Sequence, residues 1–464
     1  MAYMVVYISR FILVFLFAIY TFDCFWSLRS GVSRERQRSM YHRQVLIMYT
    51  ILIDLNLCIY VSTNNIFILV FMIAQMVFFA ISMLIYKKIY KHASYALINN
   101  MCMLMTISFA ILARLDFANA IKQFVMAVIG MVATCFIPAL ISKLKVWNRL
   151  KWVYAIIGIL GLALVLVVGS TVYGAKLNIN LGPITIQPSE FIKIIFVFFV
   201  AAMLYVLPKD DLTKMKIDFK SYDFRLVLIA TAVAGMHVLI LVLSKDLGNA
   251  CIFLFTYIVM LYVATRKPLY LIITLAGTAV GGVLIYFLFN HVRVRVAAWL
   301  DPLGTIQDQG YQVSQSLFAI GTGSWFGMGL CQGMPDKIPV VSQDFVFAAI
   351  SEELGAIFGL CLIFVCISCL FMFFNIAMEI RDQFYKLIAL GLGTLYGVQV
   401  FITLGGVTKF IPSTGVTLPL VSYGGSSLLS TMVLFAIIQG LYCRMFDKDK
   451  NEEDLESYQV RGDR

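Results

Sequence analysis

Thirteen apolar stretches of about membrane-spanning length constrain the fold of this chain more than any other feature of its sequence. A transmembrane α-helix needs about 20 mostly apolar residues, whereas a strand of a membrane barrel needs only about 9–11. Lipid offers no partner to unpaired backbone groups, so long apolar segments must be helical there. We therefore expect an all-α, polytopic integral membrane protein. The expected spans are 4–28, 44–62, 66–86, 94–112, 121–140, 152–170, 191–207, 226–244, 247–264, 268–290, 345–374, 386–405 and 427–443.

The composition excludes a soluble enzyme and a disordered chain. Hydrophobic residues make up 61% of the 464 residues and charged residues 13%, against about 45–50% and about 25% in soluble domains. The net charge is +11. In a membrane protein such an excess indicates topology and contact with anionic lipid, so we expect the membrane as a partner and no nucleic acid.

The basic residues predict the orientation of the chain. If the loop 29–43 is cytoplasmic, 26 of the 36 Lys and Arg residues lie in cytoplasmic loops or the C-terminal tail, and nine lie outside. Cytoplasmic loops of membrane proteins carry the excess of Lys and Arg. The N-terminus is therefore expected outside the cell and the C-terminus in the cytoplasm.

Two external loops are long enough to suggest a function. They cover 171–190 and 291–344, and loops above about 15 residues are usually functional or disordered. The second loop contains Trp299, Trp325 and many glycines, which indicates a packed structure. The segment 407–430 is also external and is interrupted by prolines and glycines, as in broken helices that line a cavity.

Several charged residues next to these loops have a structural and a functional interpretation. Glu190 and Lys193 lie three residues apart, so they form either an ion pair at a helix start or the wall of a substrate groove. Asp246 and Asp344 each precede an apolar run and are either helix caps or functional carboxylates. Glu352 and Glu353 lie within the span expected at 345–374, where an ionisable group is functional or paired by default.

Seven motifs of this chain resemble the SEDS family (shape, elongation, division and sporulation), the FtsW/RodA/SpoVE type. They occur in the family's order and extend the resemblance over roughly 93–446. The motifs are VLVVGSTVYGAK at 165–176, QPSEFIK at 187–193, DLG at 246–248, RVRVAAWLDP at 293–302, GYQVSQSLFAIGTGSWFGMGL at 310–330, DFVFAAISEELG at 344–355 and PSTGVTLPLVSYGGSSLLS at 412–430.

The resemblance implies a ten-helix catalytic core at 93–446 with both ends in the cytoplasm. Residues 1–92 then form an N-terminal extension with three transmembrane helices, and 447–464 form a polar cytoplasmic tail. The implied activity is that of a peptidoglycan glycosyltransferase, which polymerises lipid II at the outer face of the bacterial cytoplasmic membrane. The family acts in cell division, elongation or sporulation, usually with a class B penicillin-binding protein as partner.

The resemblance also implies a set of site residues. The family's proposed catalytic carboxylate falls on Asp344, and its groove-lining polar residues fall on Lys176, Glu190, Lys193, Asp246, Arg293 and the SYGGSS segment with Ser422 and Ser426. Tyr311 and Gln312 precede Asp344 in the long loop and are candidates for contacts to sugars.

The chemistry of this reaction agrees with one carboxylate and several cations. The leaving undecaprenyl diphosphate needs charge neutralisation by Lys, Arg or a divalent cation such as Mg²⁺ or Mn²⁺. The attacking 4-hydroxyl of GlcNAc needs a base, which one carboxylate can supply. We therefore predict Asp344 as the base, with Lys176, Lys193 and Arg293 near the diphosphate.

Two other functions stay open from the sequence. A lipid II flippase or polyprenyl-lipid transporter would also use broken helices and intramembrane Glu352 and Glu353. A non-catalytic scaffold for a penicillin-binding protein is the third interpretation, because the motif flanks depart from the family. Ser342-Gln343 replace its usual His-Thr, Ser244-Lys245 replace Gln-Pro, and Leu177-Asn178 replace Arg-Trp.

Overall fold

The structure is a computed structural model that describes residues 2–29, 31–144, 146–172, 175–181, 184–207 and 222–462. Within these ranges twelve helices are long and apolar enough to cross a membrane. The helix α7 (Pro188–Leu204) has 17 residues, and at 1.5 Å per residue it still covers about 25 Å. The expectation of an all-α, polytopic membrane protein is confirmed.

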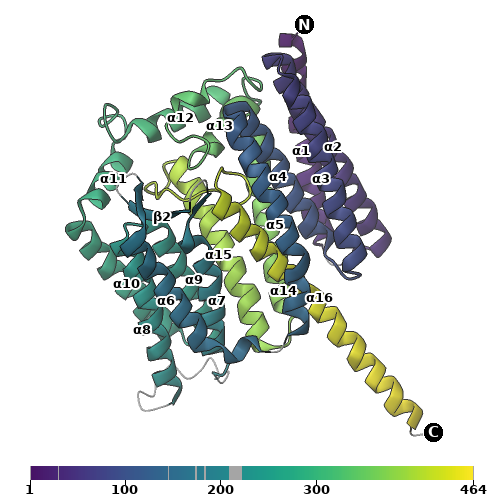
Figure 1. The fold of residues 1–464 in the computed structure, drawn as a ribbon, viewed down its shortest axis with the longest axis vertical. Helices are drawn as coiled ribbons and strands as arrows, with labels where there is room; N and C mark the ends of the chain where they lie inside the picture. Colours follow the sequence, from purple (N-terminus) through teal and green to yellow (C-terminus); the bar gives the residue numbers. More distant parts are fainter. Residues whose placement is uncertain are drawn as a thin grey trace.

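Three helices precede the rest of the bundle and stand along one side of it (Figure 1). They are α1 (Ala2–Ser27), α2 (Arg34–Thr63) and α3 (Ile66–Ile89). The helix α1 packs on α14 (Ala356–Glu379), where the ring centroids of Phe17 and Phe358 lie 4.5 Å apart. The Tyr20 hydroxyl donates to Asn100 Oδ1 over 3.0 Å. These helices are therefore packed on the bundle through both apolar and polar contacts.

The helix α4 (Tyr95–Leu115) lies between these three helices and the rest of the bundle, and its most apolar 18 residues are all buried. Next come α5 (Phe117–Lys143) and, from the far end of the sequence, α16 (Gly425–Gly462), which packs along α5. Glycines permit this close approach. A Cβ at Gly440 would lie 2.8 Å from the Cα of Pro138 on α5.

The middle of the chain forms the opposite side of the bundle (Figure 1). Its helices are α6 (Lys151–Val168), α7, α8 (Tyr222–Leu243), α9 (Leu247–Thr265) and α10 (Pro268–Leu288), with the 3-10 turn η1 (Trp147–Arg149) before α6. The expected loop 171–190 contains a small antiparallel sheet of β1 (Ser170–Val172), β2 (Ala175–Leu181) and β3 (Ile184–Ile186), in which Asn180 pairs with Thr185. The sheet is a minor addition to the helical fold.

The long loop 291–344 is folded, as its composition predicts, and it lies at one end of the bundle (Figure 1). It contains most of α11 (Asn290–Leu300), α12 (Tyr311–Gly323) and the 3-10 turn η2 (Pro335–Lys337). Ser316 on α12 donates to the carbonyl of Val407 at the end of α15 (Gln383–Val407) over 2.9 Å. The loop is thus fixed to the bundle below it.

The prediction of one uninterrupted span at 345–374 is wrong. The chain forms α13 (Val346–Leu354), breaks at Gly355, and continues as α14. Gly355 has φ +90°, and a Cβ there would lie 2.3 Å from Gly327 N. The backbone of the loop also bonds the end of α13, because the N–H groups of Met328 and Gly329 donate to the carbonyls of Glu352 and Glu353 over 3.0 and 2.9 Å.

Candidate active site

The folded loop brings Asp344 and Arg295 to one small pocket. Asp344 lies in the turn before α13, Arg295 lies on α11, and both line a pocket of about 110 Å³. The pocket is therefore large enough for a reacting group. The other lining residues are Val294, Ala298, Trp299, Gln309, Gln312, Val313, Gly406, Ile411, Ser413 and Gly415.

The Asp344 carboxylate is not a helix cap. Phe345 occupies the N-cap position of α13, and no side chain caps this helix. Within the described part of the chain no hydrogen bond to the Asp344 carboxylate is formed. A carboxylate in a protein pocket without a hydrogen bond is costly unless it has a function or a charge partner. The capping interpretation therefore fails for Asp344.

Electrostatics set the pKa of Asp344. Desolvation in the pocket raises the pKa of this carboxyl to about 6, and the positive charge of Arg295 opposes the rise. Burial lowers the pKa of Arg295, while the charges of Asp344 and Asp246 raise it. A carboxylate with a pKa near 6 is mostly ionised at pH 7 and is better matched to proton transfer than an ordinary Asp.

Backbone carbonyls of the segment 407–415 hold α11 at the pocket. Arg295 Nη1 donates to the carbonyl of Thr414 over 3.1 Å. Trp299 Nε1 donates to the carbonyl of Lys409 over 3.1 Å. The broken segment after α15 thus supplies one wall of the pocket. This agrees with the expectation that irregular backbone at membrane depth lines a cavity.

The same segment also approaches Asp344 directly. Gly415 has φ +75°, a conformation that glycine adopts at no steric cost. A Cβ added there would lie 3.5 Å from Asp344 Oδ2, so the Gly415 backbone lies beside the carboxylate. The N–H of Tyr423 donates to the carbonyl of Ser342 over 2.7 Å and joins the Asp344 turn to the chain before α16.

The basic group beside Asp344 is Arg295, although the sequence pointed to Arg293. Arg293 is exposed and does not line the pocket. Both residues belong to the motif RVRV, and the motif was expected in a loop. In the helix α11 two residues that are two positions apart point in different directions. Had 290–300 been predicted as a helix, the sequence would have shown that Arg293 and Arg295 cannot both point to the same site.

Glu190 and Lys193 form an ion pair inside the bundle. Lys193 Nζ lies 2.6 Å from Glu190 Oε2 and 2.8 Å from Gln399 Oε1, and Lys193 is 1% exposed. Ser430 Oγ donates to Glu190 Oε2 over 3.0 Å. The structural interpretation of this pair is confirmed. The ammonium group of Lys193 is engaged by protein and does not line the Asp344 pocket.

Asp246 is a helix cap with a further role in charge balance. Its carboxylate accepts from the N–H of Asn249 over 3.2 Å, from Asn249 Nδ2 over 2.9 Å and from Ser189 Oγ over 3.1 Å. Burial raises its pKa, and the hydrogen bonds of Asn249 oppose the rise. Its charge also acts on Arg295. Asp246 therefore stabilises α9 and lies near the guanidinium of the pocket.

Of the other predicted site residues, one lines the Asp344 pocket and others lie elsewhere. Gln312 lines the pocket, whereas Tyr311 is exposed at the start of α12 and does not. Ser426 Oγ accepts from the N–H of Gln187, and Ser422 Oγ accepts from the N–H of Leu418. Ser426 thus fixes the backbone just before α7, and Ser422 fixes the segment before α16. Lys176 lies in β2, and its side chain is outside the described residues.

Glu352 and Glu353 have partners at the same end of the bundle. Glu353 Oε1 accepts from Arg114 Nε over 2.9 Å, and Glu352 Oε1 accepts from the N–H of Met334 over 2.9 Å. Asp336 Oδ2 lies 3.5 Å from Arg114 Nη1. The two glutamates therefore fix the long loop to α4 and α13, which is the paired role that their position in the sequence allowed.

The described residues hold no cluster of side chains suited to a divalent cation. No group of three His, Cys, Asp or Glu side chains that could hold a metal occurs among the described residues. Asp246 and Glu190 were candidates, but their oxygens accept hydrogen bonds from Ser189, Asn249, Lys193 and Ser430.

Comparison with known proteins identifies the family. The family model for cell cycle proteins of the FtsW, RodA and SpoVE type matches residues 89–444. The chain belongs to the FtsW/RodA/SpoVE family. The resemblance seen in the motifs is thereby confirmed, and the helices α1–α3 lie almost entirely before the matched region.

Relatives, two of them named as peptidoglycan glycosyltransferases, are similar over most of the chain. The peptidoglycan glycosyltransferase RodA of Mycobacterium tuberculosis (strain H37Rv) is 34% identical over 329 residues, which are 69% of each chain. The stage V sporulation protein E of Bacillus subtilis (strain 168) is 34% identical over 332 residues, 69% of this chain and 86% of that one. The probable FtsW of Neisseria gonorrhoeae (strain NCCP11945) is 32% identical over 354 residues, covering 68% and 76%.

Solved structures of the FtsW/RodA/SpoVE family share the fold. A chain from a peptidoglycan synthase complex, described for its coordination of polymerisation and crosslinking, matches with a TM-score of 0.62 and 26% identity. The match covers 75% of this chain and 97% of that one. RodA of Thermus thermophilus matches with a TM-score of 0.53 and 24% identity over 75% and 96%, which supports the fold alone.

Proposed function

We propose that this protein is a peptidoglycan glycosyltransferase that polymerises lipid II, with Asp344 as the general base. Membership of the family and the similarity to named glycosyltransferases support the reaction class. The observation that carries the assignment of Asp344 is its carboxylate in a folded loop, free of hydrogen bonds within the described residues and beside the guanidinium of Arg295.

In the proposed step, the 4-hydroxyl of a GlcNAc attacks the anomeric carbon of a neighbouring lipid-linked chain. Asp344 accepts the hydroxyl proton while the bond from that carbon to the diphosphate oxygen breaks. Undecaprenyl diphosphate leaves as an anion and therefore needs positive charge rather than a general acid. Arg295 supplies this charge at the pocket, because Lys193 is buried in its pair with Glu190.

The proposed site also bears on the flippase alternative. The groups with unusual environments, Asp344 and Arg295, lie in the loop at one end of the bundle. Alternating access needs a binding site that opens to both faces of the membrane. The position of the pair at one end favours chemistry on one side of the membrane.

The scaffold alternative rests on altered motif flanks, of which Ser342-Gln343 precede Asp344 and Ser244-Lys245 precede Asp246. The structural contact of Ser342 uses its backbone carbonyl, which accepts from Tyr423. Gln343 is exposed and does not line the pocket. Substitution of these two side chains therefore leaves the observed position of Asp344 intact, which favours an active enzyme.

We further propose the finer points of localisation and assembly. The pocket faces the outside of the cytoplasmic membrane, the N-terminus lies outside, and the C-terminus lies in the cytoplasm, in accordance with the 26-to-9 division of basic residues. The partner is a class B penicillin-binding protein. The similarity to a chain of a peptidoglycan synthase complex supports this partner class.

The test is a reaction of the purified full chain with fluorescent lipid II, alone and with a class B penicillin-binding protein, read as glycan polymer on a gel. We expect polymer in at least one arm. A parallel assay measures transfer of labelled lipid II between the leaflets of vesicles. Transfer without polymer would support a flippase, and neither activity with a partner that is stably bound would support a scaffold.

A further inference from the structure

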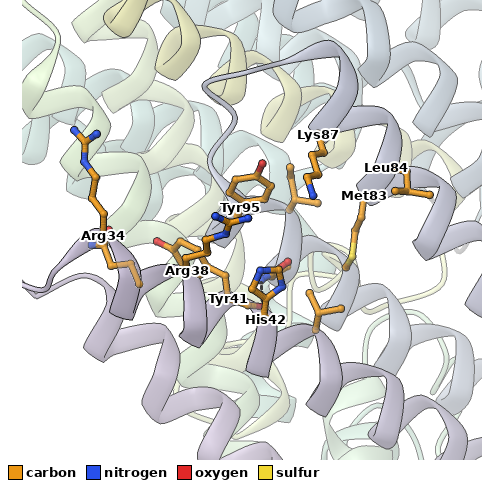
Figure 2. Close-up of a pocket in the computed structure, with 12 residues that line it drawn as sticks. Arg34, Arg38, Tyr41, His42, Met83, Leu84, Lys87 and Tyr95 are labelled. Atoms are coloured by element: carbon orange, nitrogen blue, oxygen red, sulfur yellow. Dashed lines mark hydrogen bonds between the residues drawn. The ribbon is translucent and has the colours of Figure 1, made fainter.

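A second and larger pocket lies away from the Asp344 site, between α2, α3 and the start of α4 (Figure 2). Its volume is about 510 Å³. The helices α2 and α3 belong to the N-terminal extension, whereas α4 belongs to the region that matches the family. No part of the proposed reaction uses this pocket. The lining residues that carry the inference are Arg34, Arg38, His42, Met83, Leu84 and Lys87.

The charge of this pocket is of one sign. Arg34, Arg38 and Lys87 line it and are exposed, and no Asp or Glu is among its lining residues. Within the described part of the chain the side chains of these three residues form no ion pair, in contrast to Arg43, which pairs with Asp23. His42 projects from α2 on the same side (Figure 2). Three cations without a carboxylate make an anion the expected ligand.

Part of the pocket lining is apolar. Val45, Met83, Leu84 and Ile98 line it together with Tyr41 and Tyr95. Leu84 is 64% exposed on the outer side of α3, where the hydrocarbon of the membrane would lie. In Figure 2 Met83 and Leu84 lie near Lys87 on the same helix, α3. A ligand that fits both parts has an anionic head and an apolar chain.

The pocket is at the membrane boundary opposite the Asp344 loop. The helix α2 begins there at Arg34, α3 ends there with Lys87 and Lys88 in its last turn, and α4 begins there at Tyr95. The other end of α4 carries Arg114, which bonds Glu353 below the long loop. Basic pockets between helices at the cytoplasmic boundary are suited to phosphate head groups of lipids.

We propose that this pocket is a binding site for an anionic phospholipid of the cytoplasmic leaflet. The phosphate lies between Arg38 and Lys87, and one acyl chain runs along Met83 and Leu84. Because the pocket is lined by both the extension and α4, the bound lipid joins the extension to the catalytic core. This inference does not depend on the role of Asp344.

The test compares two double variants of the full chain with equal loss of charge. Arg38→Gln/Lys87→Gln removes two cations of the pocket. Arg36→Gln/Lys88→Gln removes their neighbours on the same helices, which are exposed and do not line it. Binding of phosphatidylglycerol and of phosphatidylcholine with the same acyl chains is measured by native mass spectrometry. We expect wild type and the control variant to retain phosphatidylglycerol at least tenfold better than the pocket variant.

Three outcomes would overturn the proposal. The first is equal retention of both lipids by wild type, and the second is equal loss in the two double variants. The third is binding of inorganic phosphate at millimolar concentration that fully displaces phosphatidylglycerol, which would indicate a site for a soluble anion. If the pocket variant does not fold, a photoreactive phosphatidylglycerol tests wild type directly. Labelled peptides must then come from 34–45 and 83–99.

Discussion

The Asp344 carboxylate has an unusual environment for an acidic side chain at the start of a helix. It has a guanidinium beside it but no hydrogen bond within the described residues, and its pKa is about 6. Asp246 is the contrasting case, because it caps α9 and accepts three hydrogen bonds. The two aspartates have similar sequence contexts, and only the three-dimensional environment separates the proposed base from the cap.

The first prediction concerns pH. Asp344 must be ionised to accept a proton, so kcat/KM for polymerisation should fall as the pH decreases through about 6. The sign for stability is opposite. The folded-state pKa lies above the ordinary value of about 3.9, so ionisation costs stability above pH 6 and protonation restores it below. Thermal unfolding should therefore occur at a higher temperature at pH 5.5 than at pH 7.5.

Replacement of Asp344 by Asn provides the control for this prediction. The Asn variant should lose the part of the stability change that occurs near pH 6, because the amide does not titrate there. An acid limb near pH 4 for polymerisation by wild type would contradict the proposed environment of Asp344.

The second prediction separates the two arginines of α11. Arg295→Gln should lower kcat/KM by about 10²–10³, the usual effect of removing one group that stabilises a developing anion. It should also move the acid limb to higher pH, because Arg295 lowers the pKa of Asp344. Arg293→Gln is the matched control and should stay within a few-fold of wild type. Equal losses in both variants would remove Arg295 from its assigned role.

At the scale of the elements, α7, α15 and α16 are held together by buried polar groups. Lys193 on α7 bonds Glu190 on its own helix and Gln399 on α15, and Ser430 on α16 bonds Glu190. Gln399 Nε2 in turn donates to the carbonyl of Thr417 in the broken segment before α16. This network supports the segment that reaches the Asp344 pocket.

The third prediction tests this structural role. Lys193→Met leaves the Glu190 carboxylate buried without its cation and should cost about 3–5 kcal/mol of stability. The double variant Lys193→Met/Glu190→Gln removes both charges and should recover most of this loss. Midpoints of thermal unfolding in detergent give the comparison. If Lys193→Met unfolds like wild type but binds lipid II poorly, the lysine acts on the substrate as first predicted from the sequence.

Hydropathy predicts the helices well because lipid imposes the same requirement on every span. It did not find the break at Gly355, because both α13 and α14 are apolar. Glu352 and Glu353 lie at the end of α13, and both are buried by tertiary packing that the sequence does not show. Their partners, the Arg114 guanidinium and the N–H of Met334, come from distant or irregular segments. Contacts of this kind depend on tertiary structure and have no local signal.

The candidate site could be predicted in part for a similar reason. The position of Asp344 at the end of a long external loop was visible in the sequence. Arg295 was not separated from Arg293, because the helix α11 was expected to be loop. The burial of Lys193 was also hidden, since its partner Gln399 lies 206 residues away.

At the scale of the whole molecule, the extension and the family core form one bundle. The side chain of Arg10 on α1 donates to the carbonyl of Gly327 in the long loop over 3.0 Å, and the rings of Phe11 and Phe326 lie 5.2 Å apart. The extension therefore contacts the folded loop at one end and forms the basic pocket at the other. Its removal should affect both ends.

The fourth prediction is the orientation of this bundle. Cysteine introduced at Thr63 should react with a membrane-impermeant maleimide in intact cells, and cysteine at Lys91 should react only after permeabilisation. Both positions are exposed, and they lie at opposite ends of the extension. A background with Cys331→Ser removes the partly exposed thiol of the long loop. Labelling of the Lys91 position in intact cells would contradict the proposed topology.

The central claim is that Asp344 is the base of a lipid II polymerase, and replacement by Asn tests it most directly. Asn keeps the size of the side chain but cannot accept the proton. Purified Asp344→Asn should be folded, at least as stable as wild type at pH 7.5, and able to bind lipid II, while forming almost no glycan polymer. Asp308→Asn, an exposed carboxylate of the same loop, is the matched control and should polymerise normally. Polymerisation by Asp344→Asn at a rate near that of wild type would contradict the account.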